Sequence, residues 1–394
     1  MHISVIIPIF RVEAYIERCA RSLMEQTLEE VEFIFVDDCS PDGSVDVLQR
    51  VIADYPEREG QVRIIRHERN RGLPAARNTG LTEATGEYIF HCDSDDFIER
   101  DAVEKMYEIA KKEDADIVYT DWYLDISPSQ GPSLTPPVGG RTSVRYMRCP
   151  TYSTPKEALR GLLHGTMKYN VWNKLVRKSL YGLYEDEDEN ENDNEDDNDN
   201  ENQDQDQHQD EDENVIVKKD TICPNSSFRY RYRFRPTGYR FRPTSIRFPE
   251  GHGMGEDMTM ILLFARARKV AYLPVATYHY VRQNENAFTA SCRGATGGLY
   301  DDLRFNAERV IHALTEKVAD EDLACFKLNV KYPFLISNRG EDFQRWNQWF
   351  PEANKYISSH HVSHRARLLE HCAAHRFYAP LKLHYHLFHM FTNA

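Results

Sequence analysis

Three carboxylates within four residues follow an apolar run in the stretch YIFHCDSDD, residues 88–96. The apolar run is typical of a buried strand, so Asp93, Asp95 and Asp96 place negative charge together at one strand tip. Such carboxylates repel one another unless a cation lies among them, and hard oxygen ligands suit Mg²⁺ or Mn²⁺. We therefore expect a metal site at Asp93 and Asp95; the alternative is a solvated helix start with acids in its first turn.

Polar side chains also follow the neighbouring predicted strands. Asp37 and Asp38 precede a Ser-Pro-Asp-Gly turn, where a carboxylate commonly binds the ribose or base of a nucleoside, although a turn-forming aspartate has the same pattern. Gly72 permits a tight loop before Arg77, which is either a fixed cation for a diphosphate or an ordinary surface arginine. Both strand tips are therefore candidates for binding a nucleotide.

A second acidic pair, Glu256 and Asp257, follows two glycines in GMGED and precedes the apolar stretch MTMILLFARA. This pattern is typical of a helix start with acids in its first turn. A carboxylate opposite a metal-bound diphosphate can instead act as the general base for an incoming hydroxyl. The pattern alone leaves both interpretations open.

The elements that must position these residues alternate between short apolar runs and stretches of helical periodicity. Predicted strands cover residues 2–9, 32–36, 62–66, 88–92 and 117–120. Predicted helices cover residues 12–27, 44–53, 74–84 and 101–112. The alternation predicts βαβ units and a mostly parallel sheet, in which ligands bind beyond the carboxyl ends of the strands. Four successive strand tips are therefore expected to meet at one crevice.

Charge is distributed unevenly along the 394 residues, whose net charge is −14. Residues 185–213 hold eighteen of the 63 acidic residues and no Lys or Arg, so the remainder has 45 acids, 49 bases and a net charge of +4. Such a tract cannot bury enough apolar surface to fold. We expect residues 185–245 to be an insertion, acidic first and then basic and aromatic, and the last hundred residues to be helical.

The insertion and the carboxyl-terminal tail each have competing interpretations. The acidic tract lacks EF-hand spacing for Ca²⁺, and the arginines between 229 and 247 can bind nucleic acid or anionic lipid, or simply neutralise the acids. Nucleic acid is not the expected partner. The basic, aromatic tail at 375–394 can rest on an anionic membrane surface, or pack as a helix against the rest of the chain.

Compartment signals favour the cytoplasm. The eight cysteines are scattered without a CxxC pair, which suits a reducing environment. The start MHISVIIPIF has no signal-peptide pattern, and no run of about 18 apolar residues predicts a membrane-spanning helix. We expect a cytoplasmic protein with peripheral contact to the inner face of a membrane.

Four stretches, residues 4–44, 70–96, 172–181 and 247–258, occur in the order seen in the family 2 inverting glycosyltransferases. The chain resembles this family densely over residues 1–125 and more thinly over 165–290. The resemblance implies an α/β fold of the GT-A (Rossmann-like) type, with a mostly parallel sheet flanked by helices. It assigns the nucleotide-sugar half to residues 1–125, the acceptor-side half to 126–184 and 246–290, the low-complexity insertion to 185–245 and a helical region to 291–394.

The same resemblance implies roles for single residues. Asp257 resembles the catalytic base, with Glu256 beside it, and Asp93 and Asp95 resemble the metal-binding pair, with Asp95 the better direct ligand. The donor nucleotide and its diphosphate are expected at Pro8, Phe10, Glu13, Asp38, Arg77, Asp93, Ser94 and Asp95.

The implied reaction moves one sugar from a nucleotide-diphosphate sugar, most simply a UDP-sugar, to a hydroxyl of a glycan or lipid-linked acceptor. Mn²⁺ or Mg²⁺ would neutralise the leaving diphosphate, and Asp257 would take the acceptor proton. One sugar per cycle is expected because only Gln344-Arg345-Trp346 is present of the processive Q-x-x-R-W motif. The rivals are a nucleotidyltransferase, which the absence of a phosphate loop in PIFRVEAY disfavours, and a non-catalytic protein that uses the charged insertion.

Overall fold

The structure is a computed structural model that describes residues 1–126, 144–182, 245–282, 298–337 and 339–392, with side chains as far as Tyr385. Residues 185–244 of the expected insertion lie outside the described residues. The described chain contains one sheet, whose strands are β1 (Ile3–Ile9), β2 (Val31–Asp37), β3 (Val62–Arg66), β4 (Tyr88–His91), β5 (Phe97–Ile98), β6 (Ile117–Asp125), β7 (Val144–Met147), β8 (Lys174–Arg177) and β9 (Val270–Val281).

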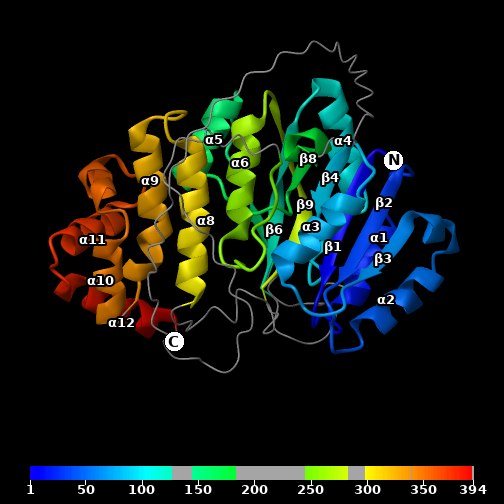
Figure 1. Cartoon of the computed structure of the whole chain (residues 1–394), viewed down its shortest axis with the longest axis horizontal. Coiled ribbons are helices and arrows are strands. Elements are labelled where there is room, and N and C mark those ends of the chain that lie inside the picture. The colour runs from blue at the N-terminus through cyan, green and yellow to red at the C-terminus, as the bar shows by residue number, and fades with distance from the viewer. Residues whose placement is uncertain (127–143, 183–244, 283–297, 338, 393–394) are drawn as a thin grey trace, which may run out of the picture. The chain divides into compact units, whose positions relative to one another are not determined.

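The strand order in the sheet is β3-β2-β1-β4-β8-β6-β9-β5, with β7 paired to β6 (Figure 1). The first four strands are parallel, as the sequence predicts. The other half is mixed, because β8 is antiparallel to both β4 and β6 while β9 is parallel to β6. Strand β8 therefore joins the two halves of the sheet.

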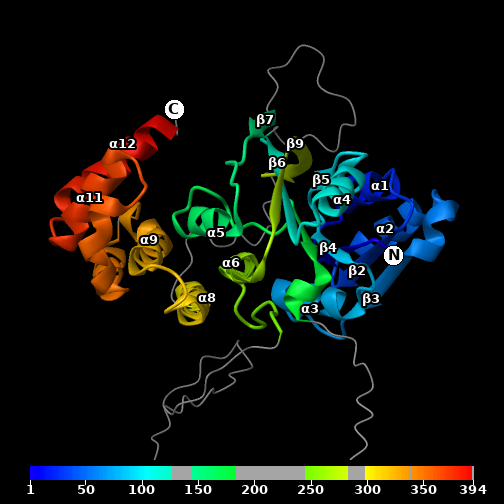
Figure 2. The same cartoon turned by 90° about the horizontal axis from the view of Figure 1, so that it is seen from above.

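Helices cover both faces of the sheet (Figure 2). One apolar core contains alternate residues of β1 and β2 together with residues of α1, α2 and α4. The other packs the opposite faces of β1 and β2 against α3, and it continues over β6 and β8 to α5, α6 and later helices. The helices of this part of the chain are α1 (Ile16–Met24), α2 (Ser44–Ala53), η1 (Pro56–Gln61), α3 (Leu73–Glu83), α4 (Ala102–Glu113), α5 (Pro155–Leu163), η2 (Lys178–Tyr181), η3 (Glu256–Met258) and α6 (Thr259–Arg266).

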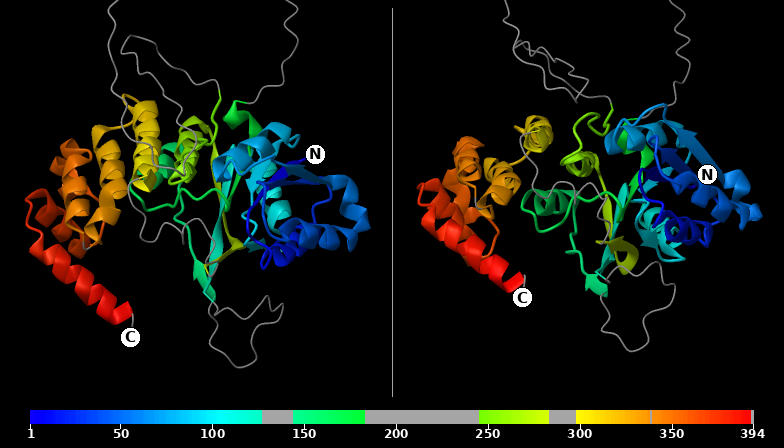
Figure 3. Two further views of the ribbon diagram at one scale, coloured as in Figure 1. Left: turned by 60° about the horizontal axis from the view of Figure 1, so that its bottom comes forward. Right: turned by 90° about the horizontal axis from the view of Figure 1, so that it is seen from below.

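The predicted α/β fold and the helical carboxyl-terminal region are confirmed, with elements close to their expected bounds. Two differences are informative. Helix α1 begins at Ile16 rather than residue 12, and β6 continues to Asp125, past the predicted end at residue 120, through a register shift beside Asp121. The carboxyl-terminal region contains α8 (Gly298–Leu314), α9 (Asp320–Lys331), η4 (Tyr332–Leu335), α10 (Gly340–Gln348), η5 (Pro351–Ser359), α11 (His364–Ala374) and α12 (Ala379–Thr392) (Figure 3).

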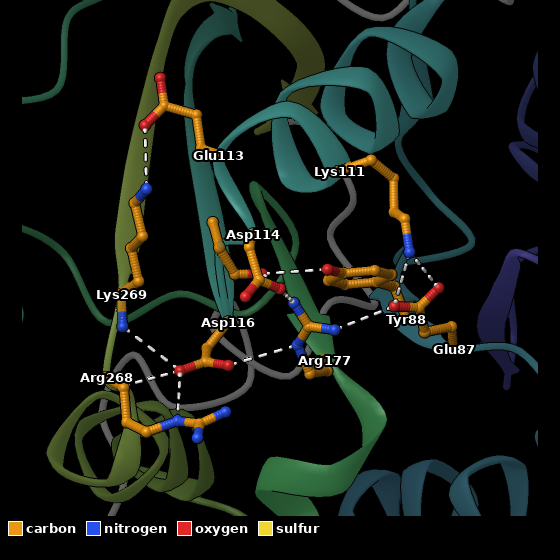
Figure 4. A network of polar contacts seen from close by, with 10 residues as sticks. Glu87, Tyr88, Lys111, Glu113, Asp114, Asp116, Arg177, Arg268 and Lys269 are labelled. Carbon is orange, nitrogen blue, oxygen red and sulfur yellow. Dashed lines mark hydrogen bonds and ion pairs between the residues drawn. The ribbon is translucent and has the colours of Figure 1, made fainter.

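Arg177, at the end of β8, lies beside the residues at which β4 and β6 begin (Figure 4). Its guanidinium lies 2.9 Å from Glu87, 2.6 Å from Asp114 and 3.2 Å from Asp116, and it stacks 4.9 Å from the ring centre of Tyr88. These contacts connect the starts of β4 and β6 to the strand inserted between them.

Asp116 carries this network on to β9. Its Oδ2 accepts hydrogen bonds from the backbone N–H groups of Arg268 (2.7 Å) and Lys269 (3.2 Å), just before β9 begins. The carboxylate is 4% exposed, so its charge depends on these donors and on Arg177. We call Arg177, Glu87, Asp114 and Asp116 the strand-start clamp.

Replacing Arg177 should destabilise the fold, because Asp116 would keep a buried charge without its nearest side-chain cation. We expect Arg177→Met to lower the free energy of unfolding by about 2–3 kcal/mol, measured by urea denaturation. Arg268→Met is the matched control: its side chain is 88% exposed and its Nε lies 3.7 Å from Asp116 Oδ2, whereas its backbone N–H, which the substitution keeps, donates to the same oxygen at 2.7 Å. Equal losses in the two variants would contradict the role of the clamp.

Candidate active site

Arg77 of α3 lies at the centre of the carboxylates that the sequence singles out. Its Nη2 is 2.9 Å from Asp93 Oδ1, and its Nη1 is 2.7 Å from Glu256 Oε1 and 3.0 Å from Asp257 Oδ1. The arginine is 1% exposed. The structure therefore brings the DSDD turn, α3 and the GMGED segment together, although 179 residues separate Arg77 from Glu256.

This place differs from the one expected for Arg77. The sequence suggested a cation extending into the crevice to meet a diphosphate, whereas both terminal nitrogens of the buried guanidinium contact protein carboxylates. A planar guanidinium with its fixed fork of donors can hold several carboxylates at once, which a lysine cannot do in the same way. We therefore assign Arg77 to holding the acidic side chains in place.

Local backbone conformation explains how these residues reach one another. Gly72 has φ +88° immediately before α3, and Pro74 occupies the first turn of that helix, where its missing N–H needs no partner. Gly255 has φ +87° immediately before Glu256 and Asp257. A side chain at either glycine would be strained, so the two turns define where α3 and the acidic pair begin.

Burial and mutual repulsion control the charge of the acidic pair. Burial raises the pKa of Glu256 to about 8, helped by the charge of Asp257 and opposed by Arg77. Burial also raises the pKa of Asp257, against the opposing effect of Arg77. Burial would lower the pKa of Arg77, but Asp93, Asp257 and Glu256 outweigh it and the net direction is upward. The arginine thus stays charged while the pair holds protons more readily than ordinary carboxyls.

The two acids differ in access to solvent. The Glu256 side chain is 8% exposed and that of Asp257 is 29% exposed. Asp257 is therefore the member of the pair that a molecule from solvent can approach. Glu256 lies behind it, where it can adjust the charge around Arg77.

The DSDD turn separates into structural and accessible carboxylates. Asp96 is 1% exposed, accepts hydrogen bonds from Tyr278 Oη (2.7 Å) and Val281 N (2.7 Å), and thereby joins the turn to β9. The backbone N–H of Asp93 donates to the same tyrosine oxygen at 3.1 Å. The Asp93 side chain is 26% exposed and Asp95 is partly exposed, so these two can meet a ligand.

The donor set at this turn suits a hard divalent cation held partly by its substrate. Among the residues that the structure describes, no group of three or more His, Cys, Asp or Glu side chains is arranged as a complete metal site. Mg²⁺ commonly uses one or two protein carboxylates and completes its coordination with phosphates and water. Asp93 and Asp95 fit that incomplete set, whereas Asp96 is already occupied by donors of the protein.

Asp38 is buried at the tip of β2 and holds the loop before α3. Its carboxylate accepts hydrogen bonds from the backbone N–H groups of Arg71 (2.8 Å) and Gly72 (2.7 Å), and it lies 2.7 Å from His67 Nδ1. The expected role was contact with the uracil or ribose. The geometry shows that Asp38 shapes the loop that leads to Arg77, and its contact with a nucleotide stays a prediction.

The other expected nucleotide residues lie around the tips of β1, β2 and β4. Pro8 is buried within β1, Phe10 just beyond it is 38% exposed, and Ser94 is 5% exposed in the DSDD turn. Glu13 accepts a hydrogen bond of 2.9 Å from the backbone N–H of Gly43, which ties the loop after β1 to the start of α2. Phe10 therefore offers an accessible ring at this edge, while Pro8, Glu13 and Ser94 shape its surroundings.

Sequence reasoning missed Asn78, which attaches the GMGED segment to α3. Its Nδ2 donates to the carbonyl of Phe248 at 2.9 Å, and its Oδ1 accepts from the N–H of Phe248 at 2.9 Å. This double hydrogen bond fixes the backbone eight residues before Glu256. The only signal in the sequence was its place beside Arg77 in the stretch AARN.

Sequence reasoning also missed Lys174, a buried cation at the start of β8. Its Nζ donates to Asn170 O (2.6 Å) and Asn173 Oδ1 (2.7 Å), and the residue is 1% exposed. Burial lowers the pKa of Lys174 to about 8, and the neighbouring Cys149 and Asp257 oppose this shift. Burial likewise raises the pKa of Tyr169 to about 12, with a further contribution from Asp257. The turn before β8 therefore lies within the electrostatic field of the acidic pair.

Removing the central cation should destabilise the protein in a pH-dependent way. We expect Arg77→Met to lower the free energy of unfolding by about 3–5 kcal/mol at neutral pH, because three carboxylates would lose their buried counter-ion. Without the guanidinium the folded-state pKa values of these carboxyls rise further, so the folded protein gains protons and the deficit shrinks as the pH falls. Urea denaturation at several pH values measures both effects.

The control is Arg71→Met, whose side chain is 42% exposed and pairs with Glu250 at 3.0 Å on the surface. Its backbone contact with Asp38 is unaffected by the substitution. A deficit for Arg77→Met that is the same at acidic and alkaline pH would contradict the electrostatic explanation.

Comparison with known proteins identifies the family of the amino-terminal part of the chain. Residues 4–155 match the family model described as glycosyl transferase family 2. The chain is 33% identical over 179 residues to an uncharacterized glycosyltransferase, EpsJ, of Bacillus subtilis, covering 45% of this chain and 48% of that protein. It is 31% identical over 185 residues to a cholesterol galactosyltransferase of Borreliella burgdorferi, with the same two shares. The chain thus spans about half the length of these curated relatives.

Solved structures show the fold. Residues 1–349 of TarS from S. aureus, solved in complex with UDP-GlcNAc, align with a TM-score of 0.58 over 99% of this chain and 92% of that chain, at 17% identity. At that identity the likeness establishes the GT-A type architecture, which agrees with the strand order and the helical carboxyl-terminal region described above. The chain carries, in residues 4–155, a domain that belongs to glycosyl transferase family 2.

Proposed function

We propose that the chain is an inverting glycosyltransferase that moves one sugar from a UDP-sugar to a hydroxyl of a glycan or lipid-linked acceptor. The observation that carries this proposal is the meeting of Asp93, Glu256 and Asp257 around buried Arg77 at the carboxyl ends of the parallel strands. The family 2 match and the UDP-GlcNAc complex of the similar TarS structure support the donor class.

In the proposed reaction Asp257 is the general base. It is the more exposed acid of the pair, and its raised pKa suits a group that must take a proton and later release it. Arg77 holds its carboxylate in place at 3.0 Å and holds the neighbouring buried Glu256 at 2.7 Å. The acceptor oxygen attacks the anomeric carbon from the face opposite the leaving diphosphate, so a single displacement inverts the configuration.

Asp93 and Asp95 are the proposed ligands of Mg²⁺ or Mn²⁺. When bound, such an ion neutralises the negative charge that develops on the leaving diphosphate. Within the protein, Asp96, Tyr278 and Val281 hold the DSDD turn against β9, so that the two accessible carboxylates keep their orientation. Phe10 and the loop shaped by Asp38 are the proposed surroundings of the nucleotide.

We further propose that the chain works in the cytoplasm. The cysteines that the structure describes are all free thiols, although Cys19 and Cys92 lie with their sulfur atoms 4.0 Å apart. In the part of the chain that the structure covers, no helix is long and apolar enough to cross a membrane.

Donor binding should depend on both the metal and Asp95. We expect UDP-GlcNAc, used as the first probe, to raise the melting temperature of the wild type in Mn²⁺ or Mg²⁺ but not in EDTA. Asp95→Ala should abolish that shift, whereas Asp46→Asn on the exposed side of α2 should preserve it. A panel of UDP-, GDP- and dTDP-sugars then identifies the preferred donor, and metal-independent stabilisation by all of them would refute the proposed site.

Turnover should depend on an ionised Asp257. We expect Asp257→Asn to reduce UDP release from the preferred donor by about 10²–10⁴-fold while donor binding is retained. In the wild type, turnover should fall as the pH decreases through a pKa above the ordinary aspartate value of about 3.9, because protonation removes the base. Unchanged turnover in Asp257→Asn would exclude this residue as the base.

A further inference from the structure

Helices α11 and α12 and the turn between them carry the most exposed large apolar side chains of the described chain. Leu368 and Leu383 are each 61% exposed and Phe377 is 59% exposed, whereas no other large apolar residue in the described ranges exceeds 51%. Exposed basic residues accompany each of the three. We define the α11–α12 surface by Arg365, Leu368, Arg376, Phe377, Lys382 and Leu383.

The two helices are packed through other side chains, so this surface is not a consequence of loose folding. Leu369 and Ala373 of α11 and Leu381 of α12 are buried. Arg365 and Leu368 lie three residues apart, and therefore on one side of α11. The side chain of Arg365 bonds to His384 Nδ1 of α12, so the two helices contact each other next to Leu383, and Figure 3 shows their ribbons side by side.

Among residues 353–394, the exposed charged side chains that the structure describes are all basic. Glu370 is the only acidic residue between residues 353 and 394, and it is fully buried against His360, with 2.7 Å between Oε1 and Nδ1. Lys355 adds a further exposed basic side chain. Within the described part of this region no acidic side chain is exposed to offset the positive charge.

We propose that the α11–α12 surface docks on an anionic lipid bilayer. Leucine and phenylalanine side chains next to arginines and lysines match an interface that has apolar chains below and anionic headgroups above. The uniform positive charge opposes association with a second copy of the same surface. The two interpretations of the tail, helical packing and membrane contact, are then compatible, because one side of the helices packs against the chain and the other side contacts the membrane.

Vesicle co-sedimentation of the full chain tests this proposal, and it can be measured whether or not the chain transfers sugar. We expect binding to vesicles of phosphatidylcholine with phosphatidylglycerol, weakening as salt is added, and no binding to phosphatidylcholine alone. The triple variant Arg365→Gln, Arg376→Gln, Lys382→Gln should lose roughly 100-fold in partitioning, at about fivefold for each basic residue. The triple variant Leu368→Ser, Phe377→Ser, Leu383→Ser should also lose binding.

Matched controls come from exposed residues elsewhere: Arg50→Gln, Lys112→Gln and Lys317→Gln for charge, and Ile336→Ser for apolar exposure. These variants should bind as the wild type does, and circular dichroism confirms that all variants are folded. Equal binding by the surface variants, or no binding by the wild type, overturns the proposal. Binding to vesicles that appears only when residues 185–213 are deleted would also overturn the proposal, because the acidic segment, and not lipid, would then cover the α11–α12 surface. If the wild type self-associates and the serine variant does not, the surface binds a second copy of the chain, and the proposal is also overturned.

Discussion

The structure depends on the burial of one guanidinium among three carboxylates. A charge of this kind is several kcal/mol unfavourable in an apolar interior unless its partners are in place. Arg77 obtains those partners from the DSDD turn and from the segment that begins at Glu256, which reach it from different parts of the chain. The fold and the reactive group are therefore coupled, since the acids that would do chemistry are also the counter-ions that make the buried arginine tolerable.

Ion pairs have different roles at the two ends of the strands. At the strand starts, Arg177 and its carboxylates lie close to one another in a network that backbone N–H groups help to satisfy. At the strand ends, Arg77 is outnumbered by acids, and the pKa values of Glu256 and Asp257 rise as a result of burial. The first arrangement is satisfied by the protein itself, whereas the second has more acids than cations, so its acids hold protons more readily, and perturbed pKa values of this kind are common at functional sites.

The sequence predicted the parallel half of the sheet and the meeting of its strand tips, because apolar periodicity and turn residues are local signals. It did not predict that β8 pairs with both β4 and β6, because nothing within the four residues KLVR specifies partners so far away in the chain. Asp38 shows a second limit. A carboxylate at a strand tip that awaits a nucleotide and one that is held by the backbone N–H groups of Arg71 and Gly72 have the same local pattern.

The double hydrogen bond between Asn78 and the backbone of Phe248 bears on how such a chain can evolve. The proposed base, Asp257, lies beyond residue 245, and most of the proposed donor site lies before residue 97. Because the entropy of closing a chain segment grows only with the logarithm of its length, each doubling of an intervening segment is unfavourable by only about 0.6 kcal/mol. An attachment point of this kind lets the length between the two halves change over generations while the distance between donor and base stays the same.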